Sequence, residues 1–343
     1  MKRKFLLLMI VSMLLTGCYD KTETEERLYV VLMGIDGRSI PESYDIYGDE
    51  GRYIVSVGEA KLESDIGDDS EDQKTVIVSG NTFSDIKQTA DKYSDKEIYF
   101  GQLKAAVLGA DIIKDSDKLA ETVYNIERMD DINTKVVVFA SEKSAAEAVE
   151  AVMAKDSKGG LYLWDYYKNN DGNADADEYM DFENLVKCMR EDETFIIPKI
   201  TADESQILLD GGYVIKKGEF MGEITDEDIK SIKWFEGKAK GEVINDNELS
   251  ARVKKARISI ADENGVAVVS IKAECSVENG ISESIKYSQE RLETVIKSNL
   301  ENTINKARKL NADFIGLTDG DGMGSKSFKI DVEVKIISTG VIK

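Results

Sequence analysis

Two patterns of apolar residues divide the chain, and they limit its possible folds more than any single motif. Up to about residue 197, short buried strands alternate with amphipathic helices, which is typical of a mixed sheet with helices packed on it. From residue 198, paired strands come first and one long helix follows. We therefore expect a multi-domain α+β fold: an N-terminal mixed α/β region, which could form two subdomains, followed by a C-terminal antiparallel sheet packed on one long helix.

In the N-terminal region, residues 18–197, segments with strand patterns alternate with segments with helix patterns. Apolar runs predict strands at 28–35, 53–62, 75–78, 103–108 and 135–140, and helical spacing predicts helices at 82–93, 118–128 and 144–153. Thr82 and Asp85 stand three apart at the start of the first helix, as in a capping box. Residues 156–177 are rich in Gly, Asn and Asp and predict a long exposed connection before a helix near Glu178.

The C-terminal region, residues 198–343, carries two hairpin signals. They are Lys216-Lys217-Gly218 and Asp262-Glu263-Asn264-Gly265, each between two runs of strand type. A short helix is expected at 225–235 and a closing strand at 328–337. Between them, apolar residues at three- and four-residue spacing predict one long helix at about 282–310. Such a stripe is more often a core face than a receptor-binding face.

The first eighteen residues predict export and a lipid anchor. Three basic residues precede an apolar run, 5–15, which is too short to span a bilayer. The run ends in Leu15-Thr16-Gly17-Cys18, the box at which bacterial lipoproteins receive diacylglycerol on the cysteine sulfur. We therefore expect residues 1–17 to be a removed signal peptide and Cys18 to carry acyl chains such as palmitate. The alternative is an ordinary secretory signal with a chance cysteine.

Composition weakens several classes of function. The net charge of −21 becomes −24 once residues 1–17 are removed, and such a surface repels nucleic acid and anionic lipid. The chain has no histidine, which argues against zinc sites and histidine-based triads. Apart from Cys18 only Cys188 and Cys275 remain, so one disulfide is conceivable, but two buried free thiols are the expected state. We expect no cofactor and no metal.

One acidic stretch superficially resembles a calcium loop. Asp171-x-Asn173-x-Asp175-x-Asp177 alternates oxygen ligands along the chain. However, Ala176 stands where such a loop needs Gly, and Phe182 stands where it needs a bidentate Glu. A solvated acidic loop is therefore the favoured interpretation.

An acidic chain could still hide a hydrolase, because a glycosidase needs only two carboxylates. Glu59, Glu193 and Asp319 are candidates, but no spacing and no flanking aromatic residue singles them out. The Gly-rich segment 319–324 lacks the Gly-Lys-Ser/Thr of a phosphate loop and precedes a strand rather than a helix. We therefore expect no catalytic residue.

Several weak motifs gain force from their order along the chain. They are Leu15-Thr16-Gly17-Cys18-Tyr19-Asp20, the Glu-rich stretch 23–26, Gly34-Ile35-Asp36, Gly80-Asn81-Thr82-Phe83, Ile98-Tyr99-Phe100-Gly101-Gln102-Leu103-Lys104, residues 194–198, Gly211-Gly212, Phe220-Met221-Gly222 and residues 309–316. In this order they resemble the Ger(x)C family of spore germination lipoproteins, the C subunits of GerA-type nutrient germinant receptors. The likeness covers essentially the whole chain after residue 17.

The resemblance implies a non-enzymatic receptor subunit, anchored through Cys18 on the outer face of the inner spore membrane. Its implied partners are two integral membrane proteins, an A-type and a B-type subunit. Two other functions stay open: an extracytoplasmic solute-binding lipoprotein, which would have two similar lobes, and a cell-wall hydrolase, which would depend on a single Asp or Glu. The two halves of this sequence look unlike, which counts against the solute-binding protein.

Overall fold

The computed structural model describes most of the chain after residue 25. The described residues are 26–38, 40–59, 75–94, 96–155, 159–170, 180–202, 207–246, 249–279, 284–318, 323 and 326–339. The lipidation box, the candidate calcium loop and Asp319 lie outside them. Within the described residues no helix is both long enough and apolar enough to cross a bilayer.

The described residues form two sheets, and the larger one contains the strands of the first two thirds of the chain. These are β1 (Arg27–Asp36), β2 (Tyr53–Glu59), β3 (Thr75–Gly80), β4 (Glu97–Tyr99), β5 (Ala105–Leu108), β6 (Val137–Ser141), β7 (Thr194–Ala202), β8 (Ile207–Lys216) and β9 (Glu219–Ile224). The order across the described sheet is β3-β2-β1-β5-β6-β7-β8-β9, with β4 beside β1. The strands β1, β5, β6 and β7 are parallel, whereas β2 and β3 on one side and β8 and β9 on the other are antiparallel to their neighbours.

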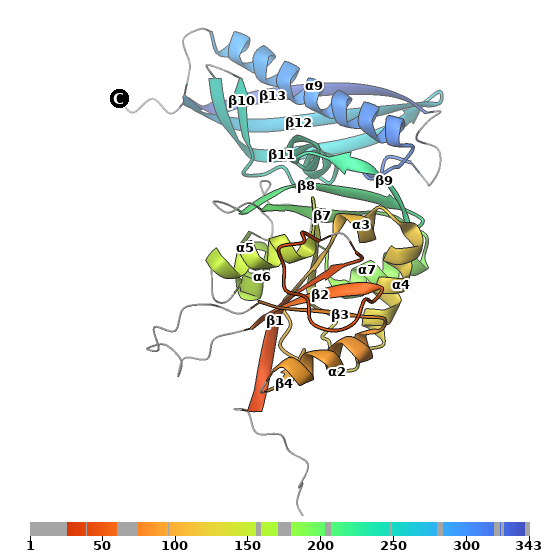
Figure 1. The fold of residues 1–343 in the computed structure, drawn as a ribbon. Helices are drawn as coiled ribbons and strands as arrows, with labels where there is room; N and C mark the ends of the chain where they lie inside the picture. Colours follow the sequence, from red (N-terminus) through yellow and green to blue (C-terminus); the bar gives the residue numbers. More distant parts are fainter. Residues whose placement is uncertain are drawn as a thin grey trace, which may run out of the picture.

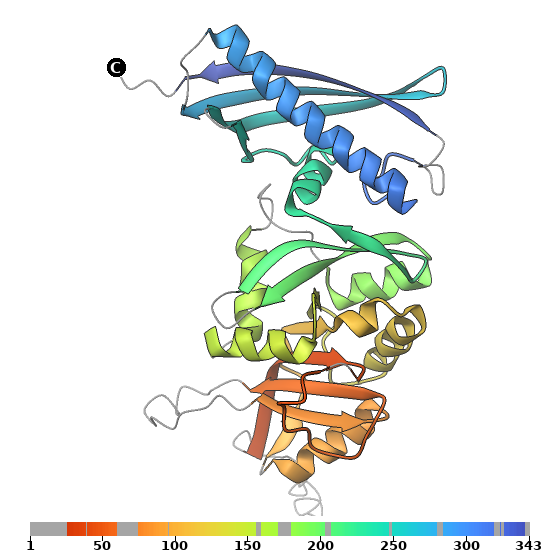
Figure 2. The same cartoon turned by 45° about the horizontal axis from the view of Figure 1, so that its top comes forward.

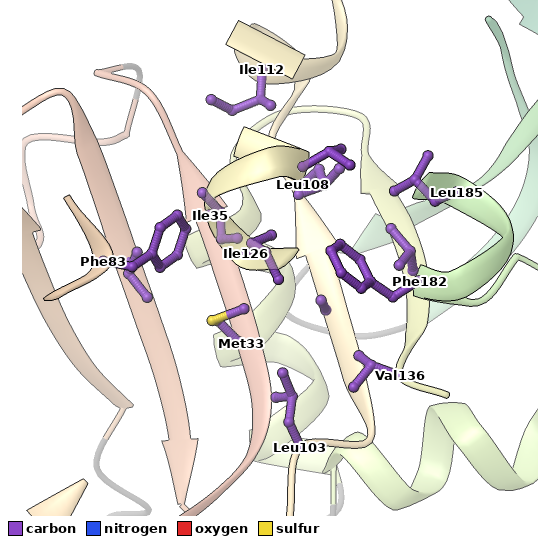
Figure 3. Close-up of a cluster of buried hydrophobic side chains, with 14 of the residues drawn as sticks. Met33, Ile35, Phe83, Leu103, Leu108, Ile112, Ile126, Val136, Phe182 and Leu185 are labelled. Atoms are coloured by element: carbon purple, nitrogen blue, oxygen red, sulfur yellow. The ribbon is translucent and has the colours of Figure 1, made fainter. Parts of the chain in front are cut away.

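Helices cover both faces of this sheet. They are α2 (Phe83–Tyr93), α3 (Ala110–Ile113), α4 (Ser116–Glu127), α5 (Ala145–Lys155), α6 (Gly159–Asn170) and α7 (Phe182–Arg190). Apolar residues of α2, α4 and α7 form one core with the sheet, and those of α5 and α6 form another on the opposite face. In the first core, Phe83, Ile126 and Phe182 surround Met33 and Ile35 of β1 (Figure 3).

The smaller sheet contains the last third of the chain and one long helix. Its described strands are β10 (Val243–Asp246), β11 (Leu249–Glu263), β12 (Val266–Asn279) and β13 (Ser327–Ser338), in that order across the sheet. The helix α9 (Ile285–Leu310) crosses one face of this sheet, and the short helix α8 (Asp226–Phe235) lies between the two sheets (Figures 1 and 2). The Asp228 carboxylate of α8 accepts hydrogen bonds from Lys306 Nζ, at 2.7 Å, and from Thr303 Oγ1, at 3.0 Å, both on α9.

The two sheets share a core at β7 and β8. Along these strands Ile197 and Tyr213 point into the core under α4 and α7, whereas Ile196 and Val214 point to the other face. There they join Ile224 and the apolar residues of α8, α9 and the smaller sheet. The sequence boundary expected after residue 197 falls inside β7. This strand hydrogen-bonds to β6, which precedes the boundary, and to β8, which follows it.

The expected fold class is confirmed, with two differences in detail. The strand β13 runs parallel to β12, so the smaller sheet is mixed, whereas β10, β11 and β12 are antiparallel as expected. The stretch 156–177 was expected to be an exposed connection, and this was wrong for residues 159–170, which form α6. Leu163 of α6 is fully buried against the sheet, because the apolar positions of this short helix face β1 and β5.

Candidate functional site

The candidate site consists of polar residues at the carboxyl ends of the parallel strands. In open α/β sheets, ligands bind outside the carboxyl ends of parallel strands. Here β1 ends at Asp36, β5 ends at Leu108 and β6 ends at Ser141, so the segments that follow these strands meet at one edge. This edge, which includes Asp36, is therefore where such a fold places a ligand site.

Asp36 is fully buried and is bonded to the first turn of α5. Its Oδ1 accepts the backbone N–H of Ala145 at 2.7 Å, and its Oδ2 accepts that of Ala146 at 2.9 Å. A Cβ on Gly109 would lie 2.0 Å from Oδ1, so only glycine leaves room there. Burial raises the pKa of Asp36 to about 7, and this outweighs the two N–H donors, which lower it.

A second carboxylate occupies the turn after β1 in the same way. Asp111 of α3 accepts the backbone N–H of Gly37 at 3.2 Å and that of Arg38 at 3.1 Å. Consecutive N–H groups in a turn, and the first N–H groups of a helix, are the places where α/β proteins bind phosphate and other anions. Because Asp36 and Asp111 occupy both, this edge offers no free backbone anion site at either position.

Beside this turn lies a hollow of about 310 Å³ with charged walls. It is lined by Gly37, Arg38, Arg52, Tyr53, Asp111, Lys118 and Glu121. Arg52 forms an ion pair with Glu121 at 2.9 Å, and Lys118 lies 3.9 Å from Asp115. Arg52 and Lys118 therefore have carboxylates beside them, which reduces their attraction for an external anion. Arg38 Nε donates instead to the Gly51 carbonyl at 3.3 Å.

The carboxylates considered for hydrolysis are not brought together. Glu59 ends β2 and lies 3.8 Å from Lys96, whereas Glu193 precedes β7 and accepts a hydrogen bond from the Cys188 thiol at 3.2 Å. The strands β1, β5 and β6 lie between β2 and β7, so the two strands are about 19 Å apart. Glycosidase carboxyl groups are roughly 5 to 10 Å apart, and these two residues cannot form such a pair.

Neither remaining described cysteine forms a disulfide. Cys275 on β12 is buried, and Cys188 on α7 is half-buried. Burial raises the pKa of the Cys275 thiol to about 11. Burial, followed by the hydrogen bond to Glu193, raises that of Cys188 to about 12. Both thiols are therefore protonated at neutral pH and unreactive.

Three of the short sequence motifs meet at a second place, the junction of the two sheets. The backbone N–H of Gly211 donates to Asp226 Oδ1 at 2.8 Å. A Cβ on Gly222 would lie 2.6 Å from Leu310, the last residue of α9. Lys216 Nζ donates to the carbonyl of Asn311, the C-cap of α9, at 2.7 Å. These motifs therefore maintain the contact between β8, β9 and the end of α9.

Two family models match this chain. The family model described as "Spore germination protein N-terminal domain" matches residues 20–202. A second, described as "Spore germination B3/ GerAC like, C-terminal", matches residues 210–320. The chain belongs to the spore germination protein family. The resemblance drawn from the order of the motifs is thereby confirmed.

A solved structure shows that this spore germination protein shares its fold with another protein. The crystal structure of the GerBC protein superposes with a TM-score of 0.54 at 16% sequence identity, covering 89% of this chain and 97% of that chain. At this identity the likeness concerns the fold alone. No curated protein sequence matches this chain significantly.

Sequence reasoning missed the role of Asp36 in this spore germination protein. The sequence placed this residue only in the Gly34-Ile35-Asp36 motif, directly after the strand expected at 28–35. Its partners lie 109 and 110 residues further along the chain. The available signal was a carboxylate between a buried strand and Gly37, because an acidic residue there either faces water or needs buried donors.

Proposed function

We propose that this chain is the lipid-anchored C subunit of a spore nutrient germinant receptor. It takes part in germination by contact with integral membrane A-type and B-type subunits and performs no catalysis itself. The observation that carries the proposal is the match of both family models over residues 20–202 and 210–320, directly after the Leu15-Thr16-Gly17-Cys18 box. Diacylglycerol on Cys18 would anchor the protein on the outer face of the inner spore membrane.

The packed junction supports an interaction subunit over a solute-binding lipoprotein. A solute-binding protein closes two lobes over a ligand about a hinge, which requires an open cleft between the lobes. Here Ile196, Val214 and Ile224 fill the space between the two sheets together with α8. An apolar interface of this kind favours a single body.

The anchor is tested by replacing Cys18 with Ala in the full chain. Cells supplied with a labelled fatty acid should incorporate the label into the wild-type protein and not into C18A, because the sulfur is the only expected acyl acceptor. Spores carrying C18A should lose most of the response to the nutrients that trigger wild-type spores. Label and membrane retention are read from the detergent-soluble fraction of spore extracts.

The two remaining cysteines provide matched controls. Cys188→Ala and Cys275→Ala should both keep the label, because the first thiol is half-buried and the second is buried, away from any signal sequence. Label on C18A would remove the anchor from the proposal. A different result would remove the receptor role: the wild-type protein carries the label, but spores germinate equally well with and without this chain.

A further inference from the structure

A stacked pair of tyrosines forms an exposed patch at the β3 edge of the larger sheet. The rings of Tyr47 and Tyr93 lie 4.5 Å apart between centroids, with an interplanar angle of 29°. Tyr47 is 40% exposed, Tyr93 is 55% exposed, and the neighbouring Ile46 is 40% exposed. We call Ile46, Tyr47 and Tyr93 the tyrosine patch. Exposed apolar clusters with a polar rim commonly mark interaction sites, where tyrosine is enriched.

The segment that carries Tyr47 is fixed to the sheet along its length. The Tyr47 backbone N–H donates to the Ile77 carbonyl at 2.9 Å, and its carbonyl accepts the Ser79 N–H at 2.8 Å, so the segment pairs with β3. Gly51 N–H donates to Ser79 Oγ at 2.9 Å. At the other end, the Tyr44 hydroxyl donates a hydrogen bond to Glu150 Oε2 of α5, with an oxygen–oxygen distance of 2.5 Å. The patch is therefore pre-organised, which lowers the entropic cost of binding.

The segment that carries Tyr47 gives the patch an acidic rim, and the exposed Lys92 precedes Tyr93 on α2. Glu42, Asp45, Asp49 and Glu50 are all exposed on this segment, and none forms an ion pair with another described residue. Asp49 and Glu50 also line a hollow of about 500 Å³ together with Ile46 and Arg38, and Arg38 Nε donates to the Gly51 carbonyl at 3.3 Å. Carboxylates beside exposed aromatic faces attract cations, because the ring face is the negative end of its quadrupole. Anionic lipid would be repelled by the same carboxylates.

We propose that the tyrosine patch and its acidic rim bind a basic segment of a partner protein. Arginine or lysine side chains of that segment would lie over the rings of Tyr47 and Tyr93, and neighbouring basic residues would pair with Asp45 and Asp49. This goes beyond the receptor role and is independent of lipidation at Cys18, so the two can fail separately.

The test measures peptide binding to the full chain carrying C18A. The probe is a pentapeptide of alternating arginine and alanine, titrated by calorimetry at low ionic strength, where exposed charges are least screened. A pentapeptide with glutamate in place of arginine should show no binding. Tyr47→Ser and Tyr93→Ser should each weaken binding of the arginine peptide about threefold to fivefold. Asp45→Asn combined with Asp49→Asn should weaken it further, and the loss should shrink as salt is added.

Two variants separate a site from general attraction to an acidic protein. Tyr93→Phe keeps the ring and should keep wild-type affinity. Tyr287→Ser removes a tyrosine that is 45% exposed on α9, far from the patch, and should leave the affinity unchanged. Equal weakening by Tyr287→Ser and Tyr93→Ser would overturn the proposal. So would binding of the glutamate peptide, or binding to phosphatidylglycerol vesicles that Tyr93→Ser abolishes.

Discussion

At the scale of single residues, Asp36 couples two distant parts of the chain. It links the end of β1 to the first turn of α5, and both carboxylate oxygens are used. The sequence predicted the strand and the helix, because each depends on local periodicity. It could not predict their hydrogen bond, because that bond depends on how the two elements pack across the sheet.

The raised pKa of Asp36 predicts a stability that depends on pH. Its folded pKa of about 7 lies above its ordinary 3.8, so between these values the native state binds the proton more tightly than the unfolded state. The contribution of this group to stability is therefore lost as pH rises from about 4 to 7, by at most about 1.4 kcal/mol per pH unit. The free energy of unfolding of Asp36→Asn minus that of wild type should therefore increase as pH rises across this window.

Urea unfolding of wild type and D36N between pH 5 and 8 measures this difference directly. The other carboxylates titrate in both proteins, so their contributions cancel when the two free energies of unfolding are subtracted. Asp117→Asn is the control for the substitution itself, because Asp117 is an exposed aspartate in the first turn of α4. A D36N difference that is the same at pH 5 and pH 8 would contradict the assignment.

At the scale of elements, local signals were the reliable ones. Lys217 and Gly218 have positive φ angles of 53° and 78°, and Asn264 and Gly265 have 56° and 85°, as the two hairpin signals require. Thr82 caps α2 through the N–H of Asp85, as its spacing indicated. The helix α6 was missed because glycines begin it, and Gly is a poor helix former. Gly160 is required there, because a Cβ would lie 1.7 Å from the Val31 carbonyl oxygen.

The packing of α6 can be tested with one pair of leucines. Leu163→Ala should lower the free energy of unfolding by about 2 to 5 kcal/mol, because Leu163 is fully buried and its loss leaves a cavity. Leu208→Ala is the matched control: Leu208 on β8 is 47% exposed, and the same change should cost less than about 0.5 kcal/mol. Chemical denaturation gives both values, and equal losses would mean that α6 is not packed on the sheet.

At the scale of the whole molecule, the shared core predicts one cooperative unfolding transition. The chain has two tryptophans: Trp164 lies on α6 against the larger sheet, and Trp234 lies on α8 in the core of the smaller one. In Trp234→Phe the fluorescence reports the first region, and in Trp164→Phe it reports the second. Each fluorescence midpoint in urea should coincide with the circular dichroism midpoint of the same variant. Separate midpoints would show that the regions unfold independently.

The two faces of β7 and β8 also limit how relatives can be recombined. Ile196, Val214 and Ile224 lie on β7, β8 and β9 of the larger sheet but pack with α8, α9 and the smaller sheet. A chimera joined at residue 197, where the sequence pattern changes, would divide one strand between two parents and mismatch both cores. A chimera joined after Ile224 would keep the strands intact, yet these three side chains would still have to fit a foreign α8. A chimera of two family members should therefore fold only when these three residues and the C-terminal region that they contact come from the same parent.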